Sequence, residues 1–417
     1  MNNNNCIKSA IKSPTFNHII ICLYLCVYLT IGFYTELKLI EEKPIPNCLL
    51  EDFRFYERAL NDALNGKDPY AIRSIGPGYL YPSPTLLIIE IFNHIKSFFL
   101  KVSLYSTLNI ALLALIVYGI TRYYGYSRDK VWYWYVICLG FAPFLELLHI
   151  GQINVITLFG IFMLFRWADT SPILSGIGLG LAVITKVSPI LFLVYLVANR
   201  KFKVMAATIA VIALITCLSI LRYGLSPVLE YPETFQWIVN QFPLGRNSQS
   251  LVAKLAIGNS IQFQNIISIA PQALQLPIVS IFAFFNSEYH IVHRILTLYI
   301  LSAIVISGLF TAYGKQPREP LFIITTLGMM LSPNIMWYHH YVFILLPLLL
   351  WMGWRRLDRG VVTWCLIGLL IVQIDRQLLT CGLLIHIFGH LSLLSILLWQ
   401  IQQFCSRRKV ERIGLFA

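Results

Sequence analysis

The chain has 417 residues, of which 57% are hydrophobic and only 12% are charged, and its mean hydropathy is +0.70. This composition excludes a soluble globular protein and predicts an all-α polytopic membrane protein that contacts membrane lipids. The formal net charge is +13, but the basic residues are dispersed over short loops, which argues against a nucleic-acid partner.

Apolar runs of membrane-spanning length recur along the chain, so we predict one transmembrane domain over residues 1–417 with no separate catalytic domain. The first run is too long for a signal-peptide core and lacks a small-residue cleavage pattern, so it is expected to remain as a span. The cysteines show neither a disulfide framework nor metal-ligand spacing. About twelve spans are predicted, near 18–40, 97–120, 131–149, 152–168, 172–186, 188–199, 203–221, 291–313, 320–334, 340–354, 361–379 and 384–404.

The tetrapeptide Lys186-Val-Ser-Pro189 divides one long apolar run into two short spans. A lysine at the bilayer centre would be costly, and the division moves Lys186 to a membrane surface. With this division the positive-inside rule predicts that both termini and the basic loops are cytoplasmic. Those loops hold Arg122, Arg128 and Lys130, then Arg166, then Arg200, Lys201 and Lys203, then Lys315 and Arg318, then Arg355, Arg356 and Arg359.

The opposite, outer side receives two long segments, residues 41–96 and 222–290. Helical spacing of apolar residues from Leu49 to Leu64, ending at Gly66, predicts an amphipathic helix that lies on the bilayer. A second apolar stretch follows Pro82 and ends near Asn93; it is too short to span and is predicted to be juxtamembrane or re-entrant.

Glu51 and Asp52 stand together at the start of the predicted surface helix. A helix N-terminus favours carboxylates, and either residue could act as a general base toward an adjoining groove. The alternative is that Asp52 only caps the helix or complements its dipole.

Several blocks recur in a recognisable order and fall on the predicted outer side. The first outer segment contains Asp52-Phe53-Arg54-Phe55-Tyr56, Ala59-Leu60, Gly66-Lys67-Asp68-Pro69-Tyr70 and Tyr81-Pro82-Ser83-Pro84. Further along are Gly151-Gln152-Ile153-Asn154, Lys186-Val187-Ser188-Pro189, Asn247-Ser248-Gln249-Ser250-Leu251, Ser332-Pro333 and Trp337-Tyr338-His339-His340-Tyr341. In this order the blocks resemble glycosyltransferase family 87 over most of the chain.

The resemblance implies the GT-C membrane fold and transfer of a sugar, mannose or another hexose, from a polyprenyl monophosphate carrier to a lipid or glycan acceptor. It places the reaction on the outer face of a membrane, which we expect to be a bacterial plasma membrane. The family's catalytic carboxylate aligns with Asp52. An inverting transfer needs one carboxylate as base, together with positive charge or hydrogen-bond donors for the departing phosphate.

Lys186 is our candidate for pairing with the donor phosphate, with Arg246 and Arg73 as helpers, and His339 and His340 could also contact the phosphate. The alternative for the basic residues is that they reach lipid headgroups from the interface, and the histidines could be plain interfacial residues.

Substrate contacts are expected from Glu51, Tyr56, Tyr81, Gln152, Asn154 and Asn247. Gln152 and Asn154 could bind sugar hydroxyls, although one of these amides is expected to pack membrane helices instead. Glu146, inside a predicted span, is expected to have a functional or structural partner such as His149.

The predicted outer loops contain no DxD-type metal motif, so we expect metal-independent activity without a cofactor. A secondary transporter or lipid flippase is the main alternative, although no inverted repeat is evident. An inactive scaffold for envelope assembly is a third possibility.

Overall fold

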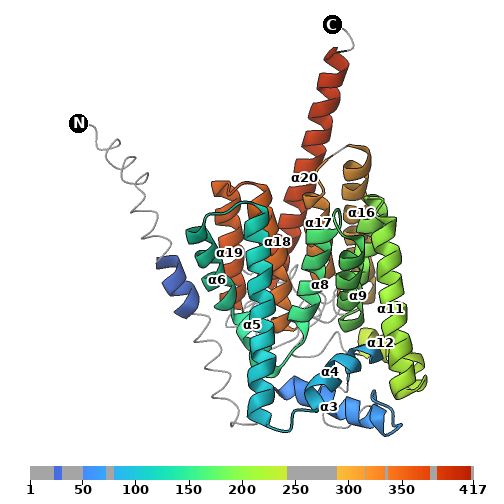
Figure 1. Cartoon of the computed structure of the whole chain (residues 1–417). Coiled ribbons are helices and arrows are strands. Elements are labelled where there is room, and N and C mark those ends of the chain that lie inside the picture. Colours follow the sequence, from blue (N-terminus) through green and yellow to red (C-terminus); the bar gives the residue numbers. More distant parts are fainter. Residues whose placement is uncertain are drawn as a thin grey trace, which may run out of the picture.

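The computed structural model describes residues 23–30, 50–71, 79–241, 289–314, 316–333, 337–375 and 383–414. Every regular element in these ranges is a helix, as the composition predicts. Figure 1 shows a bundle of upright helices, with α3 and α4 lying across one end and the chain's C-terminus at the other.

Helices occupy the predicted spans that the structure describes beyond residue 90. In chain order they are α5 (Phe98–Tyr123), α6 (Arg128–Leu139), α7 (Ala142–Ile150), α8 (Asn154–Trp167), α9 (Pro172–Thr185), η2 (Ser188–Leu191), α10 (Phe192–Ala198), α11 (Phe202–Tyr223), α16 (Tyr289–Tyr313), α17 (Glu319–Leu331), η3 (Tyr338–Ile344), α18 (Leu345–Trp354), α19 (Arg359–Asp375) and α20 (Leu383–Gly414). A further helix, α12 (Ser226–Gln241), lies within the predicted outer segment 222–290.

The predicted count of about twelve spans is not confirmed. Among the described residues, four helices (α5, α11, α16 and α20) are long and apolar enough to cross a membrane. A fifth span results if α6 and α7, which meet at a bend of 53°, count as one. The other apolar helices have 10–17 residues, or roughly 15–25 Å at 1.5 Å per residue, shorter than a hydrocarbon core of about 30 Å.

The predicted surface helix is α3 (Glu51–Leu64). It is amphipathic: Phe53, Tyr56, Leu60 and two alanines are buried, while other residues of the helix remain accessible. The predicted short helix after Pro82 is also present, as η1 (Ser83–Thr85) followed by α4 (Leu86–Asn93).

Two hydrophobic clusters hold these layers together. The larger one fills the bundle from α5 to α20. The smaller one lies at the α3 end, where the Phe53 ring packs 4.9 Å from Tyr105 of α5 and 6.0 Å from Phe92 of α4 between ring centroids. The buried face of α3 therefore faces the bundle, which fixes the orientation of the residues in its first turn.

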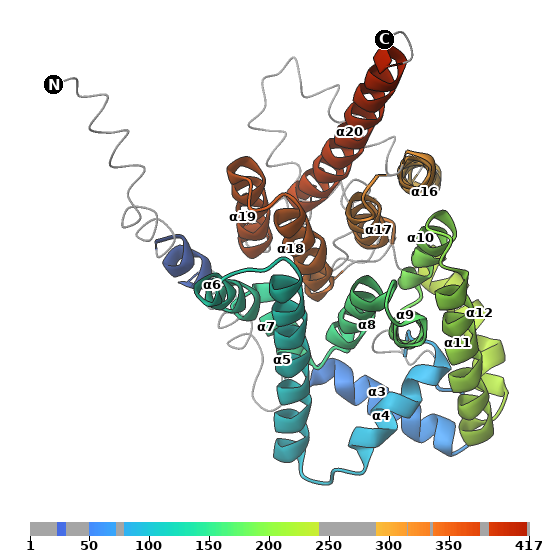
Figure 2. The same cartoon turned by 45° about the horizontal axis from the view of Figure 1, so that its top comes forward.

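Helix α9 lies deep in the bundle between α8 and α11 (Figure 2). A Cβ on Gly176 would lie 2.4 Å from Ala207 Cβ, and one on Gly180 would lie 2.6 Å from Val211 Cγ1. Such small residues four positions apart let membrane helices pack closely. The helix ends at Thr185, and Lys186 is extended with φ −160°, so the predicted break in this run is confirmed.

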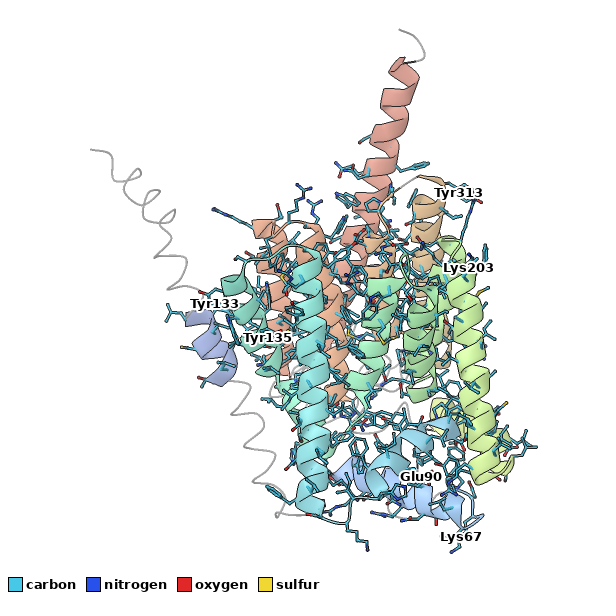
Figure 3. The ribbon with its side chains drawn as sticks, in the orientation of Figure 1. Lys67, Glu90, Tyr133, Tyr135, Lys203 and Tyr313 are labelled. Carbon is cyan, nitrogen blue, oxygen red and sulfur yellow. The ribbon has the colours of Figure 1, made fainter. Side chains whose placement is uncertain are left out.

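Loops predicted to be cytoplasmic meet at the end of the bundle opposite α3. Asp169, between α8 and α9, accepts hydrogen bonds from Lys201 and Arg318. Figure 3 shows Lys203 at this end of the bundle and Lys67 at the other. The loops that carry Lys201 and Arg318 are therefore on one side of the bundle, as the division at Lys186 requires.

Candidate functional site

The first turn of α3 is anchored against the junction between α7 and α8. The backbone N–H of Leu50 donates to the His149 carbonyl over 2.7 Å, and Leu50 has a left-handed backbone with φ 52°. Gly151 faces this turn with φ +79°, and a Cβ there would lie 2.8 Å from Leu50 Cδ2. Glycine permits both this backbone conformation and the close approach. The approach brings Asp52 to the residue that follows Gly151, which is Gln152.

Gln152 links the carboxylate of Asp52 to two tyrosines. Its Nε2 donates to Asp52 Oδ2, while its Oε1 accepts from the hydroxyls of Tyr56 at 2.9 Å and Tyr81 at 2.6 Å. The Gln152 side chain is buried. The structure thus brings together four predicted site residues from α3, the segment before η1 and the α7–α8 junction.

Both tyrosines are protonated donors at neutral pH. Burial, followed by the nearby Tyr81 hydroxyl and the Asp52 charge, raises the pKa of Tyr56 well above its usual value. Burial also raises the pKa of Tyr81, although the nearby Tyr56 hydroxyl opposes the rise. Each phenol therefore keeps its proton and can donate it to the Gln152 carbonyl.

The capping alternative for Asp52 does not hold, because Leu50 occupies the N-cap and makes no side-chain cap hydrogen bond. Asp52 lies within the first turn of α3 with Glu51. Both carboxylates have a favourable interaction with the helix dipole, and Asp52 Oδ2 also accepts a hydrogen bond from Gln152 Nε2.

A cavity of about 350 Å³ lies next to this network and shares Tyr81 with it. Most of its walls are apolar, from Leu191 of η2 to Phe235 of α12 and Ile300 of α16. Asp52 is not among the residues that line it. Its polar lining comprises Tyr81, Lys186, Ser188, Tyr231, His293, Thr297, Ser332, Trp337 and His340.

Two nitrogen donors face the cavity without a hydrogen-bond partner among the described residues. One is the buried amino group of Lys186, which lies over the Phe343 ring at 5.1 Å from the ring centroid. The other is Nε2 of His340. His340 Nδ1 accepts from the backbone N–H of Trp337 at 3.3 Å, which puts the proton of the neutral ring on Nε2. Burial lowers the pKa of Lys186 to about 7, because a buried ammonium without an anion is energetically unfavourable. An anionic ligand beside the amino group would favour its charged form, so this arrangement suits an anion.

The network and the cavity lie at the same end of the bundle. Thr85 in η1 donates its hydroxyl to the Ile184 carbonyl at 2.6 Å, and Ile184 is two residues before Lys186. This contact joins the segment that carries Tyr81 to the C-terminal end of α9. The carboxylate and the cation therefore approach the cavity region from neighbouring elements, with Tyr81 between them.

The other predicted site residues are distributed differently. His339 is buried beside His340, with 4.7 Å between ring centroids. Asn154 is fully buried in the first turn of α8, and neither end of its amide has a partner among the described residues. Glu146 is buried on α7.

Three predicted residues, Arg73, Arg246 and Asn247, lie outside the described residues. The same holds for most of the predicted outer loop over 222–290, of which the structure describes 222–241 and 289–290.

Sequence reasoning missed several features of this region. Ser188, whose buried hydroxyl has no partner among the described residues, lines the cavity, and its place in the Lys-Val-Ser-Pro block could have identified it. Tyr231 and Phe235 also line the cavity, but no motif marks them. The role of Gly151 in admitting α3 could not be seen without its neighbours.

The described residues contain no group of three or more His, Cys, Asp or Glu side chains arranged to hold a metal ion. The described cysteines, Cys26, Cys138, Cys217, Cys365 and Cys405, are all free thiols.

No curated protein matched the chain. The family model of glycosyltransferase family 87 matched residues 79–333, more than half of the 417 residues. The matched range contains Tyr81, Gln152 and Lys186, whereas Asp52 and the histidine pair lie outside it. The chain therefore belongs to glycosyltransferase family 87 and, by that membership, is a glycosyltransferase.

Proposed function

We propose that this protein transfers a hexose, with mannose as the first candidate, from a polyprenyl-phosphate carrier to a hydroxyl of a lipid or glycan acceptor. Transfer would occur at the outer face of the membrane with inversion at the anomeric carbon. The observation that carries the proposal is that the Lys186 amino group lies in a mostly apolar cavity, next to a carboxylate network that shares Tyr81 with that cavity.

The chemistry of the cavity supports a lipid-phosphate donor. Its mostly apolar walls match an isoprenoid chain, whereas a nucleotide sugar would need many polar contacts. The Lys186 ammonium and the His340 Nε2–H would both donate to the phosphate, and the Ser188 hydroxyl could add a third hydrogen bond. A monophosphate also supplies the anion that the buried ammonium otherwise lacks.

In the proposed reaction the acceptor oxygen attacks the anomeric carbon while the bond from that carbon to the phosphate oxygen breaks. Asp52 accepts the proton of the acceptor hydroxyl, and the bond electrons leave with the polyprenyl phosphate. Lys186 and His340 would stabilise the departing phosphate as its charge develops. A single displacement inverts the configuration, and the proposed step needs neither a second carboxylate nor a metal ion.

The distribution of basic residues supports the outer-face assignment. The loops with Lys201 and Arg318 meet at Asp169, at the end opposite α3. Under the positive-inside rule the basic end is cytoplasmic. The end that carries Asp52 and Lys186 would then face outward.

The test is transfer by purified protein in lipid nanodiscs, using polyprenyl-phosphate [14C]mannose and extracted membrane glycolipids as acceptors. Asp52→Asn should abolish labelled product while its expression and gel-filtration profile match the wild type. Asp62→Asn, on the same helix, is the matched control and should retain transfer. Full activity of Asp52→Asn would remove the assigned base. If the wild type moved intact donor across sealed vesicles without forming product, the transporter alternative would replace the proposal.

A further inference from the structure

The amide of Gln152 lies between the proposed base and two phenols, and the chemistry of its neighbours determines its orientation. Asp52 Oδ2 belongs to a carboxylate, which when ionised accepts hydrogen bonds and cannot donate them. The amide end that faces it must therefore be the NH₂ group. The carbonyl end then accepts the hydroxyl protons of Tyr56 and Tyr81. A flipped amide would place its carbonyl oxygen against the carboxylate.

We propose that Gln152 is a positioning residue for the general base. Its Nε2 holds the Asp52 carboxylate, while the hydroxyls of Tyr56 and Tyr81 fix the orientation of the Gln152 carbonyl. This inference rests on the proposed function and deepens it. It changes the expected role of Gln152 from sugar binding to holding the base, because both ends of its amide are already engaged by protein groups.

Burial makes this arrangement effective. Gln152 is 4% exposed, so water competes little for its hydrogen bonds, and charge-assisted bonds to a carboxylate are among the stronger ones in proteins. The residue before it, Gly151, brings its backbone against Leu50 at the start of α3. The amide and the carboxylate are therefore fixed by the same close approach of two segments.

Tyr81 gives the network a connection to the donor cavity. Its ring lines the cavity, and its hydroxyl donates to Gln152. Tyr56 donates a second hydrogen bond to the same Gln152 oxygen and is not among the residues that line the cavity. Tyr56→Phe therefore removes one of the two hydrogen bonds to the Gln152 carbonyl without changing the cavity wall.

Removing the amide donor destabilises the ionised carboxylate, and a second carboxylate in its place destabilises it further. The acidic limb of the pH–rate profile should therefore move to higher pH in Gln152→Leu and further in Gln152→Glu, by about one unit or more in the latter. The ionisable groups around Asp52 that could also contribute are Glu51 and Tyr56 on α3, Tyr81, Tyr105 on α5 and His149 at the end of α7.

The experiment measures single-turnover transfer from about pH 4 to pH 8, the range over which carboxylates and histidines titrate, for the wild type, both Gln152 variants and Tyr56→Phe. Thr208→Val, a buried isosteric change on α11 whose hydroxyl donates to the Val204 carbonyl of the same helix, is the control and should keep the wild-type profile. The expected order of shift is Gln152→Glu, then Gln152→Leu, then Tyr56→Phe.

Lower rates with an unmoved acidic limb in both Gln152 variants would show a purely structural role and overturn the inference. That result differs from failure of the proposed function. In the latter case the wild type gives no labelled product, or Asp52→Asn keeps full activity in the same assay.

Discussion

Gly151→Ala tests whether the close approach of α3 to the α7–α8 junction is what builds the carboxylate site. The added Cβ would lie 2.8 Å from both Leu50 Cδ2 and Phe53 Cβ, and 3.3 Å from Leu50 Cα. The Leu50 methyl can rotate away, but the other two atoms move only if the first turn of α3 moves. The positive φ of +79° adds about 1–2 kcal/mol of backbone strain for alanine, and overpacking adds about 1–3 kcal/mol.

Gly66→Ala is the matched control, because Gly66 has φ +68° and its Cβ would meet nothing within 4 Å. This variant should lose only the backbone term of about 1–2 kcal/mol and keep its transfer rate. Gly151→Ala should be less stable than Gly66→Ala, and its transfer rate should fall about 100-fold because a base displaced by about 1 Å loses its alignment. Thermal unfolding in detergent and transfer in nanodiscs measure the two effects. Equal transfer rates in the two variants would refute the argument.

Two further changes test the charged groups. Lys186→Met removes a buried amino group that has no hydrogen-bond partner among the described residues, so the donor-free protein should keep or gain thermal stability. The KM for the donor should rise about 10-fold or more, because a hydrogen bond to the phosphate is lost. An unchanged KM would show that Lys186 does not bind the donor phosphate. Asp169→Asn should lower stability at neutral pH by no more than about 1 kcal/mol, because the Asp169 side chain is 49% exposed. Burial raises the pKa of Asp169, but bonds and charges from Lys201 and Arg318 outweigh it and leave the pKa below its usual 3.8. The stabilisation by the Asp169 carboxylate is therefore complete above the usual carboxyl pKa and is lost as the pH falls through the lower pKa of Asp169 in the folded protein. Unfolding followed by circular dichroism at several pH values should show this loss in the wild type and not in Asp169→Asn.

Hydropathy and helical spacing were sufficient to predict most of the fold. The surface helix, the short helix after Pro82, the break at Lys186 and the helices from residue 98 onward are all present. These features depend on the apolar pattern within a few turns of chain. The number of spans did not follow, because several apolar helices are shorter than the sequence runs that predicted them and hydropathy does not show where a helix ends in three dimensions.

The candidate site was predictable only in part. The chemistry of single residues identified Asp52, Lys186 and His340 as candidates, and the predicted topology put them on one side. The roles of Gln152 and Asn154 could not be predicted in the same way. The two amides come from one motif, yet Gln152 bridges the carboxylate and the tyrosines while Asn154 is enclosed in α8.

The sequence by itself determined that the chain forms apolar helices, where a polar surface helix begins, and which carboxylates and cations are available for chemistry. The tertiary structure decided which of these groups meet. Gln152 and Asp52 are 100 positions apart, and their contact exists only because Gly151 lets two segments approach and the buried face of α3 turns the carboxylate inward. Such contacts depend on the packing of distant segments, which local periodicity does not encode.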